Sequence, residues 1–385
     1  MHKITARFFS VPDASCFIFG PRGTGKSTWI KQNLPQAYII NLLNETEYYQ
    51  HLANNKYIRE LVEANKEQYK TFVVDEIQKI PSMLDTIHDL IEENKNLCFI
   101  LTGSSARKLK RAGVNLLAGR AILKKMHPFM ATELGSDFSL DTALKFGMLP
   151  IILDSNNIPD TIATYISLYL KEEVQTEGLV RNIGDFAKFL SVISFSHGSI
   201  LNLNNIARES GVSRKIVENY LSILEDLLLG YTLPVFTKRA QREIVSHPKF
   251  YYFDAGVYYN LRPKGPLDKP SEISGMALEG LILQHLRAWS DYSKVKSELY
   301  YWRTKAGSEV DFIVYGEQYF IAIEVKNSTN VYNSDLSSLK SFIHDYPEAK
   351  AMLLYRGKDK IIKNGVLCCP VEDFLMRLVP DEFVV

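Results

Sequence analysis

Residues 16–27 read CFIFGPRGTGKS, and this stretch constrains the fold more than any other part of the chain. A short apolar run bounded by turn residues is typical of a buried parallel strand. Gly20, Gly25, Lys26 and Ser27 then match the pattern G-x-x-x-x-G-K-[ST], which requires a strand before it and a helix after it. We expect that helix to begin near Lys26 and to end before Pro35. The stretch therefore predicts an α/β domain with a parallel sheet.

The residue types in this loop suit the binding of a phosphate group. Glycines let backbone N–H groups converge on an anion without Cβ clashes, and the N-terminus of the following helix favours negative charge. We expect Lys26 to reach the β- and γ-phosphates of ATP, and the Ser27 hydroxyl to bind Mg²⁺. The alternative is an ordinary glycine turn. The residues expected to surround the nucleotide are Gly20, Pro21, Arg22, Gly23, Thr24, Gly25, Lys26 and Ser27.

A second part of the same site is predicted in residues 70–81, KTFVVDEIQKIP. The apolar, β-branched run predicts a buried strand that ends in Asp75 and Glu76. An acid at the carboxyl end of a neighbouring parallel strand lies where Mg²⁺ would be. We expect Asp75 to hold the hydration shell of Mg²⁺ and Glu76 to orient and deprotonate the attacking water. The alternative is an acidic turn after a strand.

Two further segments are candidates for contact with the nucleotide. A third strand, LCFILTGSS over residues 97–105, ends in hydroxyls, and either Thr102 or Ser104 could touch the γ-phosphate or the water. The same composition also suits a plain loop. Arg120, in NLLAGRAIL, could reach a phosphate of its own chain or of a neighbouring subunit. Its alternative is a salt bridge or a solvated helix.

The strings GPRGTGKS, VVDEIQKIP, LTGSS and LLAGRA, in this order, resemble an AAA-type P-loop family of ATP-binding proteins that is widespread in bacteria and archaea. The resemblance implies a parallel sheet wrapped by helices. It also implies that the helical connector over residues 133–180 is a lid that follows the nucleotide domain.

Residues 203–231, LNNIARESGVSRKIVENYLSILEDLLLGY, have the small residue, the turn glycine and the apolar residues of a helix-turn-helix. Ser213 is expected to cap the second helix. The basic residues at the start of this helix and in the next segment, interpreted as a wing, are Arg214, Lys215, Lys238, Arg239 and Arg242. One hypothesis is DNA binding through these residues. The other is a winged helix that serves as a structural or protein-contact unit.

The composition changes after RPKGPLDKPSE, a linker rich in proline and lysine at residues 262–272. An amphipathic helix with Glu279 near its start is expected next, then a strand, then a β-hairpin around Gly316. Asp311 interrupts the apolar run of the first hairpin strand. Glu324 and Lys326 share one face of the second strand, which costs burial unless something uses them.

An Asp followed by Glu-x-Lys on the adjacent strand suits metal-assisted cleavage of a phosphodiester. Asp311 and Glu324 would hold Mg²⁺ or Mn²⁺, Glu279 would complete the metal shell, and Lys326 would orient or polarise the water. These residues resemble the PD-(D/E)XK nuclease-like superfamily, with Val310 where the name-giving motif has proline. They also resemble the C-terminal domain of unknown function found in the same ATP-binding family. The alternatives are a fold that binds without cutting, and an exposed Glu/Lys pair on an edge strand.

Composition sets limits on these hypotheses. The net charge of +1 over 385 residues gives no global argument for nucleic acid, so local basic patches must carry it. The four cysteines lack zinc-ligand spacing, which predicts a reducing compartment. No apolar run has the length of about 18 residues that a membrane span needs, and no signal peptide is visible. We therefore expect a cytoplasmic protein with no membrane partner.

The predicted fold class is α/β. The domains would be an AAA-type P-loop domain (1–132), a helical connector (133–180), a winged helix-turn-helix (181–265) and a restriction-endonuclease-like α/β domain (266–385). The predicted function is a Mg²⁺-dependent ATPase that couples its nucleotide state to DNA binding or to DNA cleavage. The alternatives are an ATP-driven switch with non-catalytic binding domains, and an inert nucleotide-holding scaffold. A homo-oligomer is a further expectation, since Arg120 could act in trans.

Overall fold

The computed structural model describes residues 5–11, 13–54, 56–104, 120–169, 174, 180 and 182–384. The chain divides into two compact units. The P-loop unit comprises Phe9–His127 with Asp226–Leu228, and the C-terminal unit comprises Met1–Phe8, Pro128–Glu225 and Leu229–Val385. Within the described ranges, no helix combines the length and apolar character needed to cross a membrane.

The P-loop unit contains a five-stranded sheet in the order β2-β3-β4-β1-β5, with every pair of neighbours parallel. Its strands are β1 (Cys16–Phe19), β2 (Tyr38–Asn41), β3 (Thr71–Asp75), β4 (Cys98–Gly103) and β5 (Ile122–Lys125). The apolar runs before the glycine loop, before Asp75 and before Thr102 form β1, β3 and β4. These three strands are buried because helices cover a parallel sheet on both faces. The prediction of a parallel α/β fold is confirmed.

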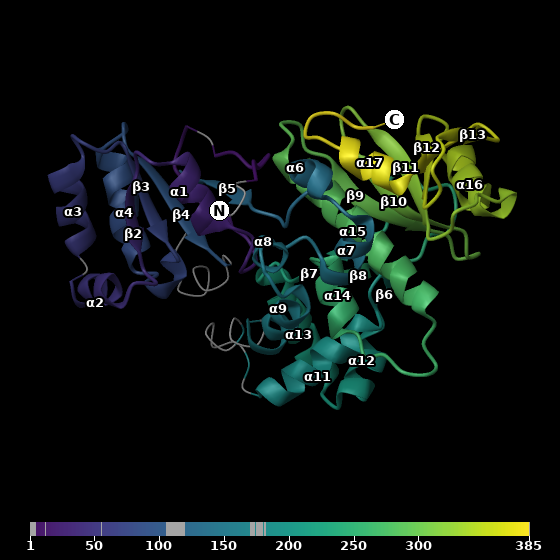
Figure 1. Cartoon of the computed structure of the whole chain (residues 1–385), viewed down its shortest axis with the longest axis horizontal. Coiled ribbons are helices and arrows are strands. Elements are labelled where there is room, and N and C mark those ends of the chain that lie inside the picture. Colours follow the sequence, from purple (N-terminus) through teal and green to yellow (C-terminus); the bar gives the residue numbers. More distant parts are fainter. Residues whose placement is uncertain are drawn as a thin grey trace. The chain divides into compact units, whose positions relative to one another are not determined.

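The helices of the P-loop unit connect these strands. They are α1 (Lys26–Asn33), α2 (Glu45–Ala53), α3 (Tyr57–Asn65), the 3₁₀-helix η1 (Ile77–Lys79) and α4 (Met83–Glu93). Helix α1 begins at Lys26 and ends at Asn33, before Pro35, as the sequence predicts. Helices α3 and α4 lie side by side (Figure 1), and the apolar face of α4 packs into the core through Leu84, Ile87 and Leu90. Of the predicted segment NLLAGRAIL, Arg120 and the three residues after it are described, whereas residues 115–119 lie outside the described residues.

The C-terminal unit begins with short helices and continues through two helices joined by a turn. The elements are α6 (Ala131–Leu134), η3 (Gly135–Asp137), α7 (Leu140–Phe146), α8 (Pro150–Leu153), α9 (Ile158–Thr164), the π-helix η4 (Tyr165–Tyr169), α11 (Ile183–Ser194), α12 (Leu203–Ser210) and α13 (Arg214–Asp226). Helices α12 and α13 follow one another at the predicted helix-turn-helix. Gly211 ends α12 with φ 75°, a conformation that glycine adopts without strain. Of the predicted helical connector, residues 170–173 and 175–179 lie outside the described residues.

A three-stranded sheet in the order β6-β8-β7 follows, made of β6 (Ser199–Ile200), β7 (Gly230–Leu233) and β8 (Lys249–Tyr252). Helices α14 (Ala255–Leu261) and α15 (Pro270–Tyr292) lead into a second sheet of six strands, ordered β13-β14-β12-β11-β10-β9. Its strands are β9 (Glu298–Arg303), β10 (Glu309–Tyr315), β11 (Phe320–Lys326), β12 (Lys350–Tyr355), β13 (Ile361–Lys363) and β14 (Val366–Pro370). The remaining elements are η5 (Asn333–Leu336), α16 (Ser337–Asp345) and α17 (Val371–Arg377). The hairpin predicted around Gly316 is the antiparallel pair β10–β11.

The segment between β7 and β8, interpreted from sequence as a basic wing, lies along the edge strand β9. The Phe236 N–H donates to the Tyr301 carbonyl at 2.7 Å, and the Val245 N–H donates to the Arg303 carbonyl at 3.1 Å. The Phe236 side chain is buried in the apolar core beside α16 and the six-stranded sheet. This segment therefore joins the β6-β8-β7 sheet to the six-stranded sheet within one unit.

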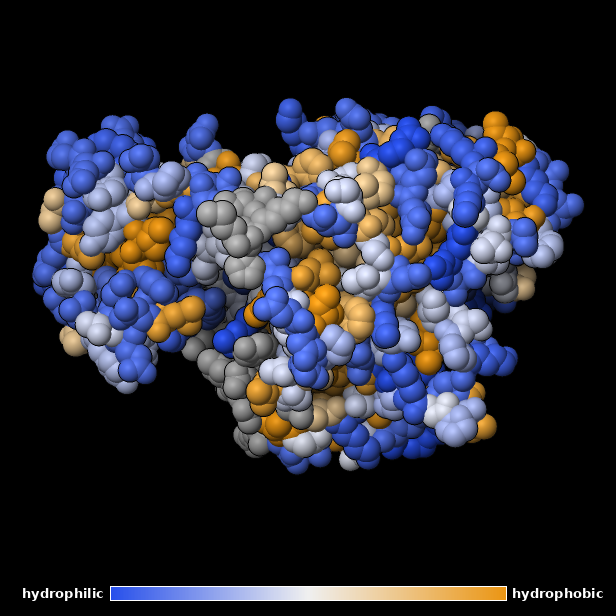
Figure 2. Space-filling view, in the orientation of Figure 1, coloured by the Kyte–Doolittle hydropathy of each residue, from blue (hydrophilic) through white to orange (hydrophobic). Residues whose placement is uncertain are grey.

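The opposite edge of the six-stranded sheet, strand β13, exposes Ile361 and Ile362, and Figure 2 shows a hydrophobic patch in the region that Figure 1 labels β13. A pocket of about 540 Å³ lies beside this strand and is lined by residues that include Lys340, Ile362 and Leu367. It contains none of the predicted site residues.

Candidate functional site

The loop between β1 and α1 has a backbone that suits glycine. Gly23 and Gly25 have φ 85° and 91°, a region that other residues rarely adopt. A Cβ on Gly20 would lie 2.5 Å from the carbonyl oxygen of Met126. Gly25 is the N-cap of α1, and because glycine has no side chain it makes no side-chain capping hydrogen bond to this helix. The first N–H groups of α1 are therefore suited to donate to an anion such as a phosphate.

Lys26 is buried at the start of α1, and its ammonium is held over the loop. Its Nζ donates to the carbonyl oxygens of Gly20 at 2.6 Å and Pro21 at 3.2 Å. A bound phosphate would offer the ammonium a charged acceptor beside these two neutral carbonyls.

The two motifs predicted from separate strands meet in the structure. The Ser27 hydroxyl donates to Oδ2 of Asp75 at 2.7 Å, and Thr102 donates from Oγ1 to Oδ1 of the same carboxylate. Asp75 is buried at the end of β3. A hydroxyl and a carboxylate are the hard oxygen donors that Mg²⁺ prefers, so Ser27 and Asp75 would suit a Mg²⁺ ion that binds together with a nucleotide.

Glu76 follows Asp75 in the left-handed region, with φ 64°. The Gln78 amide donates to Oε2 of Glu76 at 2.5 Å and to the Ser104 hydroxyl at 3.4 Å. Sequence reasoning assigned no role to Gln78, although its position two residues after Glu76 within DEIQ was the available signal. This hydrogen bond orients the Glu76 carboxylate, and the positive φ of Glu76 is a strained backbone conformation of the kind that is common at functional sites.

The other predicted nucleotide contacts lie as follows. Thr102 accepts a 3.1 Å hydrogen bond from the Glu76 N–H as well as donating to Asp75, so its hydroxyl joins the two acids. Ser104 is buried next to Gln78. Arg120 forms an ion pair with Glu92, at side-chain exposures of 40% for each partner. The roles of Thr102, Ser104 and Arg120 toward a phosphate stay predictions.

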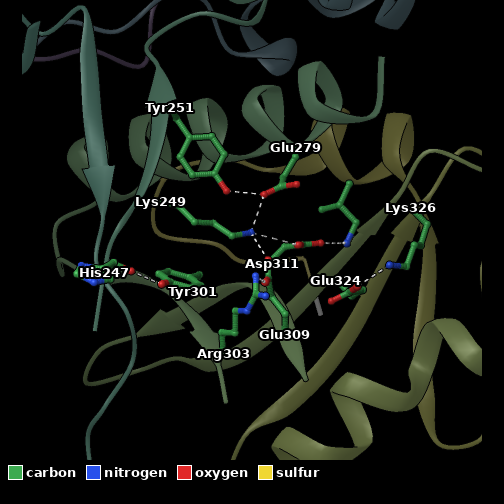
Figure 3. A network of polar contacts seen from close by, with 11 residues as sticks. His247, Lys249, Tyr251, Glu279, Tyr301, Arg303, Glu309, Asp311, Glu324 and Lys326 are labelled. Atoms are coloured by element: carbon green, nitrogen blue, oxygen red, sulfur yellow. Dashed lines mark hydrogen bonds and ion pairs between the residues drawn. The ribbon is translucent and has the colours of Figure 1, made fainter. Parts of the chain in front are cut away.

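In the C-terminal unit, the structure brings together the four residues predicted to form a metal centre (Figure 3). Glu279 projects from α15, Asp311 from β10, and Glu324 and Lys326 from β11. Asp311 lies where the register of β10 shifts between Val310 and Ile313, as at a β-bulge, and its Oδ2 accepts the Val325 N–H at 2.8 Å. Lys326 donates from Nζ to Oε1 of Glu324 at 2.6 Å.

Sequence reasoning missed the residue at the centre of this cluster, Lys249 on β8. Its Nζ lies 3.2 Å from Oε1 of Glu279, 2.5 Å from Oε1 of Glu309 and 3.8 Å from Oδ1 of Asp311. Its side chain is 2% exposed. The outer residues missed with it are Tyr251, which donates to Glu279, and Arg303, which lies 2.8 Å from Glu309. The available signal was a lysine inside the buried aromatic strand KFYY.

Burial and mutual repulsion set the charges in this cluster. Burial raises the pKa of Asp311 well above its usual range, and the charges of Glu324 and Glu279 raise it further. Burial likewise raises the pKa of Glu324 to about 7, although Lys326 works in the opposite direction. Burial lowers the pKa of Lys249, but the charges of Glu279, Asp311 and Glu309 outweigh it, so its pKa lies above the ordinary value and the ammonium stays charged.

This arrangement does not fit a divalent metal held by Glu279, Asp311 and Glu324. In the part of the chain that the structure describes, no group of three or more Asp, Glu, His or Cys side chains is arranged to hold a metal ion. The Lys249 ammonium lies between Glu279 and Asp311, where such an ion would have to sit.

The residues predicted to bind DNA divide into two groups. Arg214 and Lys215 are exposed at the start of α13, where Arg214 pairs with Glu218 of the same helix at 2.9 Å. The remaining ones lie on the segment along β9, where Lys238 lies 2.8 Å from Glu298 and Arg242 lies 2.9 Å from Asp345. Arg239 is exposed with φ 51°.

Three family models match consecutive parts of the chain. Residues 13–135 match the model described as "AAA domain", residues 137–268 match "Domain of unknown function (DUF8612)" and residues 274–374 match "Domain of unknown function (DUF4143)". The first match confirms an AAA-type domain in the N-terminal third. The last confirms the resemblance to a C-terminal domain of unknown function, and the nuclease-like nature of that domain stays a prediction.

The chain is also similar to whole proteins. It is 24% identical over 320 residues to uncharacterized proteins of Mycobacterium bovis and Mycobacterium tuberculosis, which covers 81% of this chain and 70% of each relative. Among solved structures, domain III of the replication initiation protein DnaA of Thermotoga maritima matches with a TM-score of 0.25 and 15% identity, over 44% of this chain and 80% of that one. The replication initiator DnaA bound to AMPPCP and single-stranded DNA matches with a TM-score of 0.25 and 13% identity, over 55% and 82%. The assignment of an AAA-type domain rests on the family model that matches residues 13–135.

Proposed function

We propose that the P-loop unit binds ATP together with Mg²⁺ and hydrolyses it. The observation that carries this proposal is the 2.7 Å hydrogen bond between Ser27 and Asp75. These residues are 48 positions apart in sequence, yet they meet beside a glycine loop that leads into the N-terminus of α1, where Gly25 makes no side-chain cap. A phosphate and a Mg²⁺ ion would both find matching donors at this one place.

Each residue of this site has a role that follows from its position. The loop N–H groups and the Lys26 ammonium would hold the phosphates and neutralise charge as the terminal phosphate leaves. Ser27 and Asp75 would hold Mg²⁺, which supplies charge neutralisation between the phosphates when bound. Glu76, oriented by Gln78, would accept the proton of the attacking water. Thr102 would hold the two acids next to each other, because its hydroxyl bonds both to the Asp75 carboxylate and to the Glu76 N–H.

Replacing Lys26 by alanine is expected to weaken ATP binding about tenfold to a hundredfold and to abolish turnover, because a charge-assisted hydrogen bond to phosphate is lost. Titration with a fluorescent ATP analogue and a phosphate-release assay would measure both effects. Lys31→Ala is the matched control, since Lys31 lies exposed in the last turn of the same helix. Equal ATP affinity and turnover in the two variants would contradict the proposal.

For the C-terminal unit we propose a non-catalytic platform whose binding depends on the nucleotide state, in preference to a metal-dependent nuclease. The Lys249 ammonium inside the carboxylate cluster favours this choice. DNA is the partner that Arg214 and Lys215 would suit, because both are exposed at the start of the second helix of a helix-turn-helix.

The DNA proposal predicts a change in salt dependence. Replacing Arg214 and Lys215 together by alanine should reduce the slope of log K against log salt concentration by about 2, since each phosphate contact contributes about 0.9. Fluorescence anisotropy with a labelled duplex at several salt concentrations, with and without ATP, would measure it. Lys269→Ala, which removes an exposed lysine outside α12 and α13, should leave the slope unchanged. If the wild type shows no affinity for duplex DNA, the DNA proposal is wrong, and the platform would bind another partner.

A further inference from the structure

The polar cluster of the C-terminal unit gathers four carboxylates around three cations. Its carboxylates belong to Glu279, Glu309, Asp311 and Glu324, and its cations to Lys249, Arg303 and Lys326. Buried carboxylates require a cation close by, because an unpaired charge in a medium of low dielectric is costly. The carboxylates of Glu279 and Asp311 therefore depend on whichever of these cations lies next to them.

Lys249 is the cation that lies next to Glu279 and Asp311. Arg303 reaches Glu309 and Lys326 reaches Glu324, whereas Lys249 lies within 4 Å of Glu279, Glu309 and Asp311 at once. Figure 3 shows its ammonium pointing into the space between these carboxylates. Carboxylates bind a divalent ion at about 2.0–2.6 Å, so an ion and the ammonium cannot share that space.

Lys249 also comes from a different part of the unit than the acids that it meets. It lies on β8, in the three-stranded sheet that carries the predicted winged helix, while Glu279 lies on α15 and Asp311 on β10. Lys249 opens β8, and the preceding segment runs along β9. The position of Lys249 is thus fixed by backbone pairing of the segment before it and of the strand that it opens.

We propose that Lys249 is the resident cation of this carboxylate cluster and takes the place of a divalent metal. The cluster is then a joint that fastens β8 to α15 and β10, and it becomes a divalent-cation site when the ammonium is removed. Its donors would be carboxylate oxygens, which suit Mg²⁺, Mn²⁺ or Ca²⁺. With Lys249 in place, no three acidic side chains among the described residues are arranged to hold an ion, so the carboxylates would have to move together once the ammonium is gone. Oε2 of Glu324 is buried and, in the described part of the chain, has no hydrogen-bond partner to lose.

The test is a titration of the full-length protein with Mn²⁺ in the absence of nucleotide, followed by electron paramagnetic resonance and calorimetry. We expect no Mn²⁺ site in the wild type that depends on Asp311. Lys249→Met should gain one site, with Kd at least about tenfold lower than any wild-type binding, and Lys249→Met with Asp311→Asn should lose it. Lys249→Arg keeps a cation and should gain no site. Lys238→Met is the matched control, because it removes a lysine that pairs with one exposed acid, Glu298.

Thermal unfolding gives an independent readout. Lys249→Met should lower the melting temperature of the C-terminal unit by about 10 °C, because it leaves buried carboxylates without their counter-charge, and Mn²⁺ should restore most of the loss. If this variant fails to fold, the double variant Lys249→Met with Glu279→Gln can be titrated in the same way. It removes one positive and one negative charge, so the net charge of the cluster is unchanged.

Two results would overturn the proposal. One is a wild-type Mn²⁺ site that Asp311→Asn abolishes, because the metal would then coexist with Lys249. The other is a folded Lys249→Met protein that gains no Mn²⁺ site and no stability from Mn²⁺. Neither result bears on ATP turnover, so the proposal stands or fails separately from the proposed ATPase activity.

Discussion

Glu76→Gln is expected to lower steady-state ATP turnover by about 10²–10⁴-fold, the range that a positioned general base contributes. ATP affinity should change by less than about tenfold, because in the proposed site the loop and Lys26 would hold the phosphates. The glutamine amide has the size of the carboxylate but cannot accept the proton of the attacking water. A phosphate-release assay together with ATP titration would separate the two effects.

The surroundings of Glu76 sharpen this prediction. Gln78 donates to its carboxylate, and Thr102 accepts its backbone N–H, so the variant should keep the fold of the site. Gln78→Ala should give a smaller loss of turnover than Glu76→Gln, because the base would remain but would lose its fixed direction. Glu63→Gln, an exposed acid on α3, serves as the control and should leave turnover unchanged. Full turnover in Glu76→Gln alongside an inactive Lys26→Ala would assign the base to another residue.

The geometry of the candidate nucleotide site was predictable because its determinants are local. The residues before and after the glycine loop form a strand and a helix within one short stretch, and the glycine positions follow from backbone angles that other residues avoid. Asp75 could be placed near Ser27 because the carboxyl ends of parallel strands meet at one edge of a sheet. What sequence could not supply was the orientation of Glu76 by Gln78, since it depends on a strained turn after β3.

Three acids and one cation of the C-terminal cluster were predicted from sequence, whereas Glu309, Arg303 and the central cation, Lys249, were not. The predicted residues lie on α15 and on the hairpin β10–β11, which are separated in the chain by β9 alone, so the approach of their side chains follows from a helix and a hairpin. Lys249 precedes them in sequence and reaches them because the β7–β8 connection lies along β9. Such pairing is set by long-range register, which a single sequence does not reveal. The same reason explains why Lys238 and Arg242, expected on a solvated wing, pair with Glu298 and Asp345.

A second large effect is expected in the pH dependence of stability, through two buried histidines of the C-terminal unit. Nε2 of His285 accepts the Ala131 N–H at 2.9 Å, and Nδ1 of His197 accepts the Tyr252 N–H at 3.1 Å. An accepting nitrogen carries no proton, so both rings are neutral in the folded protein. Burial lowers the pKa of His197 to about 3 and that of His285 to about 4, from an ordinary 6.5.

The sign of the effect follows from proton linkage. Above pH 6.5 both rings are neutral in the folded and unfolded states, and their full contribution to stability is present. Below pH 6.5 the unfolded state binds protons that the folded state does not, so each histidine removes about 1.4 kcal/mol of stability per pH unit until its folded pKa is reached. Asp254 acts in the opposite direction, because burial raises its pKa to about 6 and the folded state binds its proton first. The stability of the wild type as a function of pH therefore contains contributions of both signs. The contribution of one histidine is obtained by comparing the wild type with a variant that lacks it.

His285→Gln isolates one contribution, because glutamine can accept the Ala131 N–H but does not titrate. The stability of the wild type relative to this variant should fall by about 2 kcal/mol between pH 7.5 and pH 5, since about 1.5 pH units of that interval lie below 6.5. Urea unfolding in a Trp29→Phe background would measure it, because the remaining tryptophans, Trp289 and Trp302, are buried in the C-terminal unit. His344→Gln, at an exposed position on α16, should show no such change. A pH-independent difference for His285→Gln would mean that the folded protein accommodates the imidazolium, in conflict with the hydrogen bond from Ala131.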